Sequence, residues 1–238
     1  MNENKPVMLQ SHLSKGETIA VLAYIPVHIF LLPLALAIPL ANGSISEATC
    51  NLLCYGVGAV YMVALCFRFL RRDFDPLCDR PFRCVTEILS HYLMMMGFNL
   101  IVGVALSFFL TEENPNNSAI MEMAGQDYSS IKAIAVFLAP LVEEMMFRAG
   151  IFGTLRKYNR TLAYIVAILA FSLYHVWGYV FIDRMYLLYM LQYIPVSFLL
   201  CRCYERTESI WCSIFFHMLV NGVALNALSA LESLGYSV

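Results

Sequence analysis

The stretch from Ile131 to Phe152 reads IKAIAVFLAPLVEEMMFRAGIF, an apolar segment with three ionisable side chains near its middle. These side chains are Glu143, Glu144 and Arg148. An ionised group at the centre of a bilayer costs roughly 2.5–3.5 kcal/mol even on the lenient insertion scale. A chain tolerates that cost when the groups pair, face a wet cavity or take part in chemistry. We therefore expect function to centre on this triplet.

The overall composition is that of a membrane protein. Of the 238 residues, 60% are hydrophobic and only 13% are charged, and the mean hydropathy is +0.68. A soluble domain of this length needs more charge to cover its surface. The net charge of −2 gives no reason to expect a nucleic-acid partner. We expect an all-α, polytopic membrane bundle that forms a single domain over residues 1–238, with a central polar cavity and membrane lipid around it.

Seven stretches are long enough to cross about 30 Å of hydrocarbon as helices. They are Ile19–Leu40, Leu52–Phe69, Ile88–Leu110, Ile131–Phe152, Leu162–Val180, Met185–Cys203 and Ser209–Ala230. Most of the 15 lysines and arginines fall at the N-terminus and in the second, fourth and sixth connections. The positive-inside rule then predicts a multi-pass protein of the cell membrane with its N-terminus in the cytoplasm. By these boundaries the acid pair lies nearer the cytoplasmic face, so we expect substrates from that side or from the inner leaflet.

Helix geometry separates the roles of the two acids. At 100° per residue, Arg148 lies about 40° around the axis from Glu144 but about 140° from Glu143. Glu144 is therefore the natural ion-pair partner, and Glu143 is left without a counter-ion on its own helix. Pro140 removes a backbone donor one turn earlier, so we expect the helix to bend just before the acids. A purely structural packing network explains Glu144 and Arg148 well but explains Glu143 poorly.

Two other spans bring imidazoles to a similar depth. His175 follows Phe171 by four residues, and His217 precedes Asn221 by four, so each pair shares a helix face. At 1.5 Å per residue, these histidines, Asn221 and Glu143 fall in a slab about 8 Å thick. A single histidine in a membrane helix is often only an interhelical hydrogen-bonder. Four such groups at one depth indicate a shared site.

These residue types are suited to hydrolysis. Desolvation makes a carboxylate such as Glu143 a stronger base towards water, and a neutral histidine beside it can hold the same water. A second histidine with an asparagine amide supplies donors for a developing oxyanion. Since no serine or cysteine is obviously paired with a base, we expect water to be the nucleophile.

The motifs EExxxR (Glu143, Glu144, Arg148), FxxxH (Phe171, His175) and HxxxN (His217, Asn221) resemble those of the CPBP family of intramembrane endopeptidases. That family includes CAAX prenyl endopeptidases and bacteriocin-processing or immunity relatives. The resemblance covers a core of about residues 131–230 and implies peptide-bond cleavage near a membrane surface. It also implies that Glu143 and His175 activate water, that His217 and Asn221 form the oxyanion site, and that Glu144, Arg148 and Phe171 support them.

The resemblance has one departure and leaves one question on metals. The family often has glycine directly after the motif arginine, whereas Ala149 stands here and Gly150 follows. Family members have been described as metal-dependent, and Glu143 with the two histidines could bind zinc. Since the sequence has no HExxH pair, we expect no metal and no other cofactor.

Other interpretations remain open at this point. Buried Glu, His and Arg also build proton relays, so a proton-coupled transporter is one alternative, although the chain shows no paired halves. A non-catalytic peptide-binding immunity protein is another. For an endopeptidase, CAAX-type prenylated peptides and leader or bacteriocin-like peptides all fit as substrates.

Several polar residues lie outside the motifs. His28 in the first span carries no motif, and Tyr193 belongs to a tyrosine group in the sixth span that we interpret as an interfacial belt and packing surface. Residues 111–130 form the one long polar connection, which we expect to be a solvated exterior loop.

Overall fold

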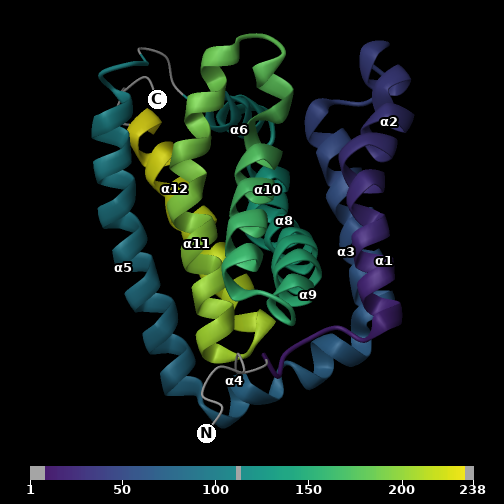
Figure 1. Cartoon of the computed structure of the whole chain (residues 1–238). Coiled ribbons are helices and arrows are strands. Elements are labelled where there is room, and N and C mark those ends of the chain that lie inside the picture. The colour runs from purple at the N-terminus through teal and green to yellow at the C-terminus, as the bar shows by residue number, and fades with distance from the viewer. Residues whose placement is uncertain (1–8, 111–113, 234–238) are drawn as a thin grey trace, which may run out of the picture.

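The computed structural model describes residues 9–110 and 114–233, without the side chains of residues 228, 229 and 231–233, and every element in these ranges is a helix (Figure 1). The N-terminal elements are α1 (Lys15–Pro26), η1 (Val27–Leu31), α2 (Leu32–Ala41), α3 (Glu47–Arg72), α4 (Asp75–Asp79) and α5 (Pro81–Leu106). The middle elements are α6 (Pro115–Gln126), α7 (Tyr128–Ala133), η2 (Ile134–Leu138), α8 (Ala139–Glu143), η3 (Glu144–Phe152) and α9 (Gly153–Arg156). The last are α10 (Arg160–Val180), η4 (Arg184–Tyr189), α11 (Met190–Thr207) and α12 (Ile210–Ser233).

Six stretches of the described residues are long and apolar enough to cross a membrane. They are Lys15–Ala41, Glu47–Asp79, Pro81–Leu106, Arg160–Val180, Arg184–Thr207 and Ile210–Ala227. The expected polytopic helical bundle is therefore confirmed. The expected span Ile131–Phe152 is not among the six, because it holds three charged side chains near its middle and is divided into short α and π segments.

That divided segment forms the centre of the bundle. The column from α7 to α9 contacts α1, α3, α10, α11 and α12, and Figure 1 shows α8 and α9 between the helices of the two halves of the chain. Surrounding protein thus covers its charged side chains, as a polar group at this depth requires.

The central column contains two wide turns. The N–H of Ala139 bonds the carbonyl of Ile134, and the N–H of Gly153 bonds that of Arg148, each five residues earlier, so η2 and η3 are π-helical. Pro140 has no N–H for the carbonyl four residues before it, which favours a wider turn at this point. The expected distortion before the acids therefore takes the form of π-helical turns.

The connection before this column differs from expectation. Residues 111–113 lie outside the described residues, but Pro115–Gln126 is the helix α6, with Met121 and Ala124 buried, so the expected solvated loop is wrong there. The side chain of Asn114 caps the helix by accepting from the N–H of Asn116, and proline occupies the first helical position. Asparagine followed by proline is a helix-start signal that outweighs the polar composition of the segment.

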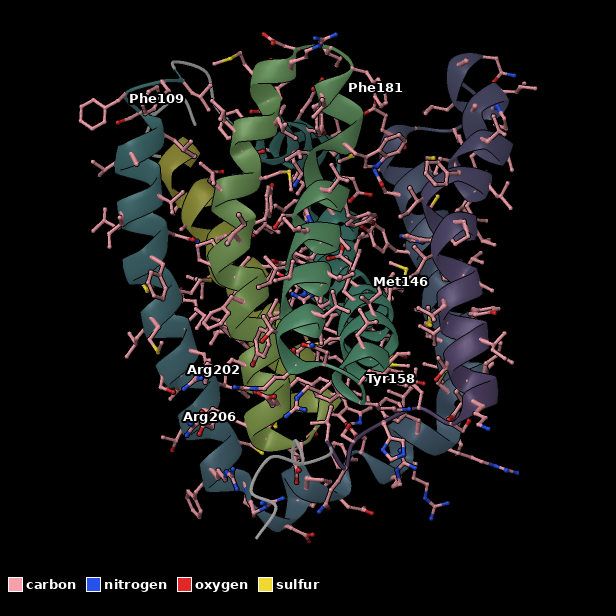
Figure 2. The ribbon with its side chains drawn as sticks, viewed as in Figure 1. Phe109, Met146, Tyr158, Phe181, Arg202 and Arg206 are labelled. Atoms are coloured by element: carbon pink, nitrogen blue, oxygen red, sulfur yellow. The ribbon has the colours of Figure 1, made fainter. Side chains whose placement is uncertain are left out.

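The two ends of the bundle differ in charge. Arg202 and Arg206 lie near the end that carries α4, whereas Phe109 and Phe181 lie near the end that carries α6 (Figure 2). Arg206 pairs with Glu87 at 2.7 Å (Nη2 to Oε1) on the α4 side. On the same side, Glu205 pairs with Arg156 at 2.6 Å and with Arg160 at 2.7 Å. We refer to this end as the arginine-rich end.

Two glycines allow helices to approach one another closely. A Cβ at Gly58 of α3 would lie 2.9 Å from Tyr24 Oη and 3.0 Å from Val142 Cγ2. A Cβ at Gly150 of η3 would lie 2.8 Å from Val21 Cγ1 of α1. The close packing that the family's glycine suggests after the motif arginine is therefore found one position later, at Gly150.

Replacement of Gly58 by leucine should destabilise the bundle, because the new side chain enters the contact between α1, α3 and α8. Overpacking of this kind costs about 1–3 kcal/mol, so the detergent-solubilised variant should melt at a lower temperature than the parent. Gly56→Leu is the matched control on the same helix, where a Cβ would meet no atom within 4 Å. Equal melting temperatures for the two variants would contradict this packing.

Candidate active site

Glu143 ends α8 and is almost fully buried, with 3% of its surface exposed. Its two carboxylate oxygens have different surroundings. Oε1 accepts a hydrogen bond from the hydroxyl of Tyr55 at 3.0 Å. Oε2 is buried without a hydrogen-bond partner. A buried oxygen of this kind requires water or a ligand to satisfy it.

Both motif histidines face this oxygen. The Nε2 atoms of His175 and His217 lie 3.7 Å and 3.9 Å from Glu143 Oε2. These separations are too long for direct hydrogen bonds, and polar groups at this spacing are commonly bridged by water. The structure therefore brings Glu143, His175 and His217 together around one small space, as the sequence predicts.

The hydrogen bonds of the other ring nitrogens fix which atoms carry protons. Nδ1 of His175 lies 2.8 Å from the carbonyl oxygen of Phe171, which can only accept, so this Nδ1 carries the hydrogen. Nδ1 of His217 lies 2.8 Å from the carboxylate oxygen Oε1 of Glu144 and donates to it in the same way. The neutral form of each ring then presents an Nε2 lone pair to Glu143.

Glu144 is the centre of a separate, fully buried network. Its Oε1 lies 2.9 Å from Arg148 Nη1, with both side chains 0% exposed, so the ion pair expected from the helix angles is present. Its Oε2 accepts from Ser213 Oγ at 2.6 Å. Together with the bond from His217, these contacts tie η3 to α12.

Phe171 connects the two groups of side chains. The guanidinium carbon of Arg148 lies 4.1 Å from the centre of its ring, a cation–π contact. The same ring lies 4.4 Å from the ring of His175 and 5.8 Å from that of His217, centre to centre. Phe171 therefore supports both imidazoles, in agreement with its expected auxiliary position.

Asn221 lies in the same region but is engaged by the backbone. Its Nδ2 donates to the carbonyl oxygen of Ala135 in η2 at 2.8 Å. It lines the cavity described below together with Glu143 and His175, whereas His217 does not form part of that wall. One Nδ2 hydrogen of Asn221 remains for a ligand.

Several residues that surround Glu143 were not predicted from the sequence. Tyr55 bonds Glu143 directly, Tyr174 bonds Tyr55 at 2.8 Å, and His28 Nε2 lies 3.2 Å from Tyr174 Oη. Tyr193, which we expected in an interfacial belt, stacks on His175 with ring centres 4.4 Å apart. Among these residues, only His28 gave a signal in the sequence, as a polar side chain in the middle of an apolar span.

A cavity of about 780 Å³ adjoins Glu143. Its wall includes the first turns of α3, part of α6, and residues near the ends of α10 and α12, and all of these lie towards the end of the bundle opposite the arginine-rich end. The expected approach from the arginine-rich side is therefore not supported, because the cavity extends from Glu143 towards α6. The span boundaries in the sequence could not show where the surrounding side chains leave space.

Within the described residues, no group of three or more His, Cys, Asp or Glu side chains is arranged to hold a metal ion. That the site works without a metal stays a prediction.

Replacement of Arg148 by methionine should destabilise the protein strongly, because it leaves the Glu144 carboxylate buried without its cation. Removing one partner of a buried ion pair typically costs about 3–5 kcal/mol. Thermal melting in detergent should show this loss. Arg202→Met near the arginine-rich end is the control. A similar fall in melting temperature for both variants would show that the buried ion pair contributes no more to stability than an arginine outside it.

Comparisons with known proteins agree with this geometry. Residues 128–223 match the family model of the type II CAAX prenyl endopeptidase Rce1-like proteins. The curated protein "Putative membrane peptidase YdiL" of Bacillus subtilis (strain 168) is 30% identical over 115 residues, which cover 48% of this chain and 43% of the relative. This chain thus matches less than half the length of that relative. No solved structure matches it. The matching segment contains all three motifs, and its side chains meet around Glu143, so residues 128–223 are similar in sequence to the Rce1-like type II CAAX prenyl endopeptidases and to a putative membrane peptidase.

Proposed function

We propose that this protein is an intramembrane, glutamate-dependent endopeptidase that hydrolyses a peptide bond with a water activated by Glu143. The observation that carries the proposal is the unpartnered Oε2 of Glu143, buried between the Nε2 atoms of two histidines. The space between these three atoms is suited to one water molecule. The family match supports the reaction class.

The two hydrogens of that water decide the roles of the two imidazoles. One hydrogen is donated to Glu143 Oε2 and the other to the Nε2 lone pair of His175. His217 Nε2 is then a third neighbour with no hydrogen left to accept, so it acts as a donor in its doubly protonated form. Glu144, which accepts from the Nδ1 of His217, stabilises the positive ring by a charge-assisted hydrogen bond.

The reaction follows from this arrangement. Glu143 takes a proton from the water as the water oxygen bonds to the substrate carbonyl carbon, which places a negative charge on the carbonyl oxygen. His217 Nε2–H and the free Nδ2 hydrogen of Asn221 are the donors that we propose for this oxyanion. When the C–N bond breaks, the proton held by Glu143 passes to the leaving nitrogen, the second hydrogen of the water stays on the new hydroxyl, and the products are a carboxylic acid and an amine.

The cavity indicates which substrates to test first. Apolar and aromatic side chains form much of its wall, among them Phe30, Leu34, Ile120, Met123 and Trp177. A lipid tail attached to a peptide is suited to such a wall. We therefore propose a prenylated C-terminal peptide of the CAAX type as the first candidate and a leader or bacteriocin-like peptide as the second. We also propose that no metal is required, because the base and both donors are protein groups.

Glu143→Gln should abolish cleavage, since an amide cannot take the proton from water, while helix content and melting temperature stay near those of the parent. Loss of a general base typically lowers the rate by about 10²–10⁴-fold. Cleavage of a farnesylated, fluorescence-quenched CAAX peptide by purified protein measures the effect. Glu47→Gln is the control, because Glu47 is an exposed carboxylate at the start of α3. Full activity of Glu143→Gln would reject the proposed base.

If the parent protein does not cleave the farnesylated peptide, the substrate class is wrong, and a second experiment decides whether the protein is a peptidase. Peptides released from membranes that contain the parent protein are compared by mass spectrometry with those from membranes that contain Glu143→Gln. A peptide set produced by the parent alone supports the endopeptidase. Identical sets would instead favour a transporter or a peptide-binding protein.

We further propose that the arginine-rich end lies in the cytoplasm, on the basis of the positive-inside rule. Cys78 in α4 is exposed at that end, and Ser44 is exposed in the connection between α2 and α3 at the opposite end. In a Cys50→Ala background, a membrane-impermeant maleimide should therefore label Ser44→Cys in intact cells but label Cys78 only after the cells are opened. The reverse pattern would invert the proposed orientation.

A further inference from the structure

A chain of three hydrogen bonds leads away from the active site through α10 to η1. Glu143 Oε1 is 3.0 Å from the hydroxyl of Tyr55, which is 2.8 Å from the hydroxyl of Tyr174. The Tyr174 hydroxyl is in turn 3.2 Å from Nε2 of His28. His28 is buried, with 4% of its surface exposed, and lines the same cavity as Glu143.

The direction of this chain follows from counting hydrogens. An ionised carboxylate can only accept, so Tyr55 must donate its single hydroxyl hydrogen to Glu143. Tyr55 therefore accepts from Tyr174, which leaves the Tyr174 oxygen to accept from the Nε2–H of His28. All three donors point towards Glu143, and bonds aligned in this way strengthen one another.

This alignment distinguishes the two oxygens of the base. Oε1 is held by the chain, while Oε2 has no partner and faces the histidines. The two oxygens of an ionised carboxylate are equivalent, so a half-turn about the terminal bond restores the same arrangement, whereas a quarter-turn would move both oxygens away from Tyr55 and from the water. The chain opposes that rotation, because rotation breaks the bond from Tyr55.

We propose that Tyr55, Tyr174 and His28 are positioning residues that fix the orientation of the Glu143 carboxylate, so that Oε2 alone faces the reacting water. This inference rests on the proposed function, since the orientation matters only if Glu143 is the base. Tyr55 and His28 lie outside the residues 128–223 that match the family. The first helices of the chain thus contribute to the site by holding its base.

Labelling with dicyclohexylcarbodiimide tests the inference without any substrate, because this reagent modifies carboxyl groups in their protonated form. Without the hydroxyl of Tyr55, Glu143 loses a donor that favours its ionised form. The reagent should therefore label Glu143 about tenfold faster in Tyr55→Phe than in the parent. This factor corresponds to the usual free energy of a hydrogen bond to a charged group. Mass spectrometry of the peptide that contains Glu143 gives the rate, and Glu143→Gln gives the background.

Tyr61→Phe is the matched control for this experiment. Tyr61 lies on the same helix, and its hydroxyl donates to the backbone carbonyl of Ala20 at 3.1 Å, away from Glu143. This variant also loses one hydroxyl and one hydrogen bond from α3, but it leaves the chain intact. Its labelling rate should equal that of the parent. Equal rates for Tyr55→Phe and Tyr61→Phe would overturn the inference.

Kinetics with the farnesylated peptide separate positioning from general stability. Tyr55→Phe should lower kcat about tenfold or more with KM within a factor of two, because the ground-state contacts of the substrate are unchanged. His28→Gln retains a donor near the position of Nε2 and should keep most of the parent activity, whereas His28→Leu should resemble Tyr55→Phe. A raised KM with unchanged kcat, or equal losses in both His28 variants, would contradict the proposed chain.

The two proposals fail in different ways. If the parent does not cleave the peptide and Tyr55→Phe still accelerates labelling, the hydrogen-bond chain stands and the proposed substrate fails. If Glu143→Gln abolishes cleavage but Tyr55→Phe matches the parent in both labelling and kcat, the base stands and the positioning chain is rejected.

Discussion

The buried carboxylate of Glu144 is the interaction on which the centre of the bundle depends. It receives Arg148 from its own helix and Ser213 and His217 from α12. Each of these groups would be costly to bury alone, and the cost is offset because they satisfy one another. Among the described residues, Arg148 is the one arginine or lysine that pairs with either acid, so the neighbouring Glu143 has no arginine or lysine partner.

That division makes two consecutive glutamates chemically different. Glu144 has an ion pair and two further donors on its oxygens, so it is held as a structural anion. Glu143 has one hydroxyl donor on Oε1 and an open Oε2 that faces two imidazoles. A general base needs an accessible lone pair in a defined direction. For the proposed base Glu143, the arrangement supplies such a lone pair by pairing the neighbouring acid with Arg148 and restraining only one oxygen of Glu143.

The helices and the motif residues could be predicted from the sequence because both depend on local periodicity. Apolar length gives the spans, and residues four apart share a face, which paired Glu144 with Arg148. Contacts between distant spans have no such local signal. Tyr55 reaches Glu143 across 88 positions of the chain, and no periodicity relates them. The helix α6 was not predicted for another reason, because the polar composition of the segment outweighed the helix-start signal at Asn114–Pro115. The direction of the cavity was not predicted because it depends on how all the helices pack.

The site therefore has two kinds of contribution. The segment that matches the family model supplies the acids, the imidazoles and the amide. The helices α1 to α3 lie outside that segment, yet they provide the hydroxyl that bonds Glu143 and, with η1, part of the cavity wall. Under the proposed function, substitutions in that wall would change which substrate tail fits without altering Glu143, His175 or His217. In the proposed peptidase, the N-terminal helices would therefore affect substrate preference, whereas the motif residues would carry out the hydrolysis.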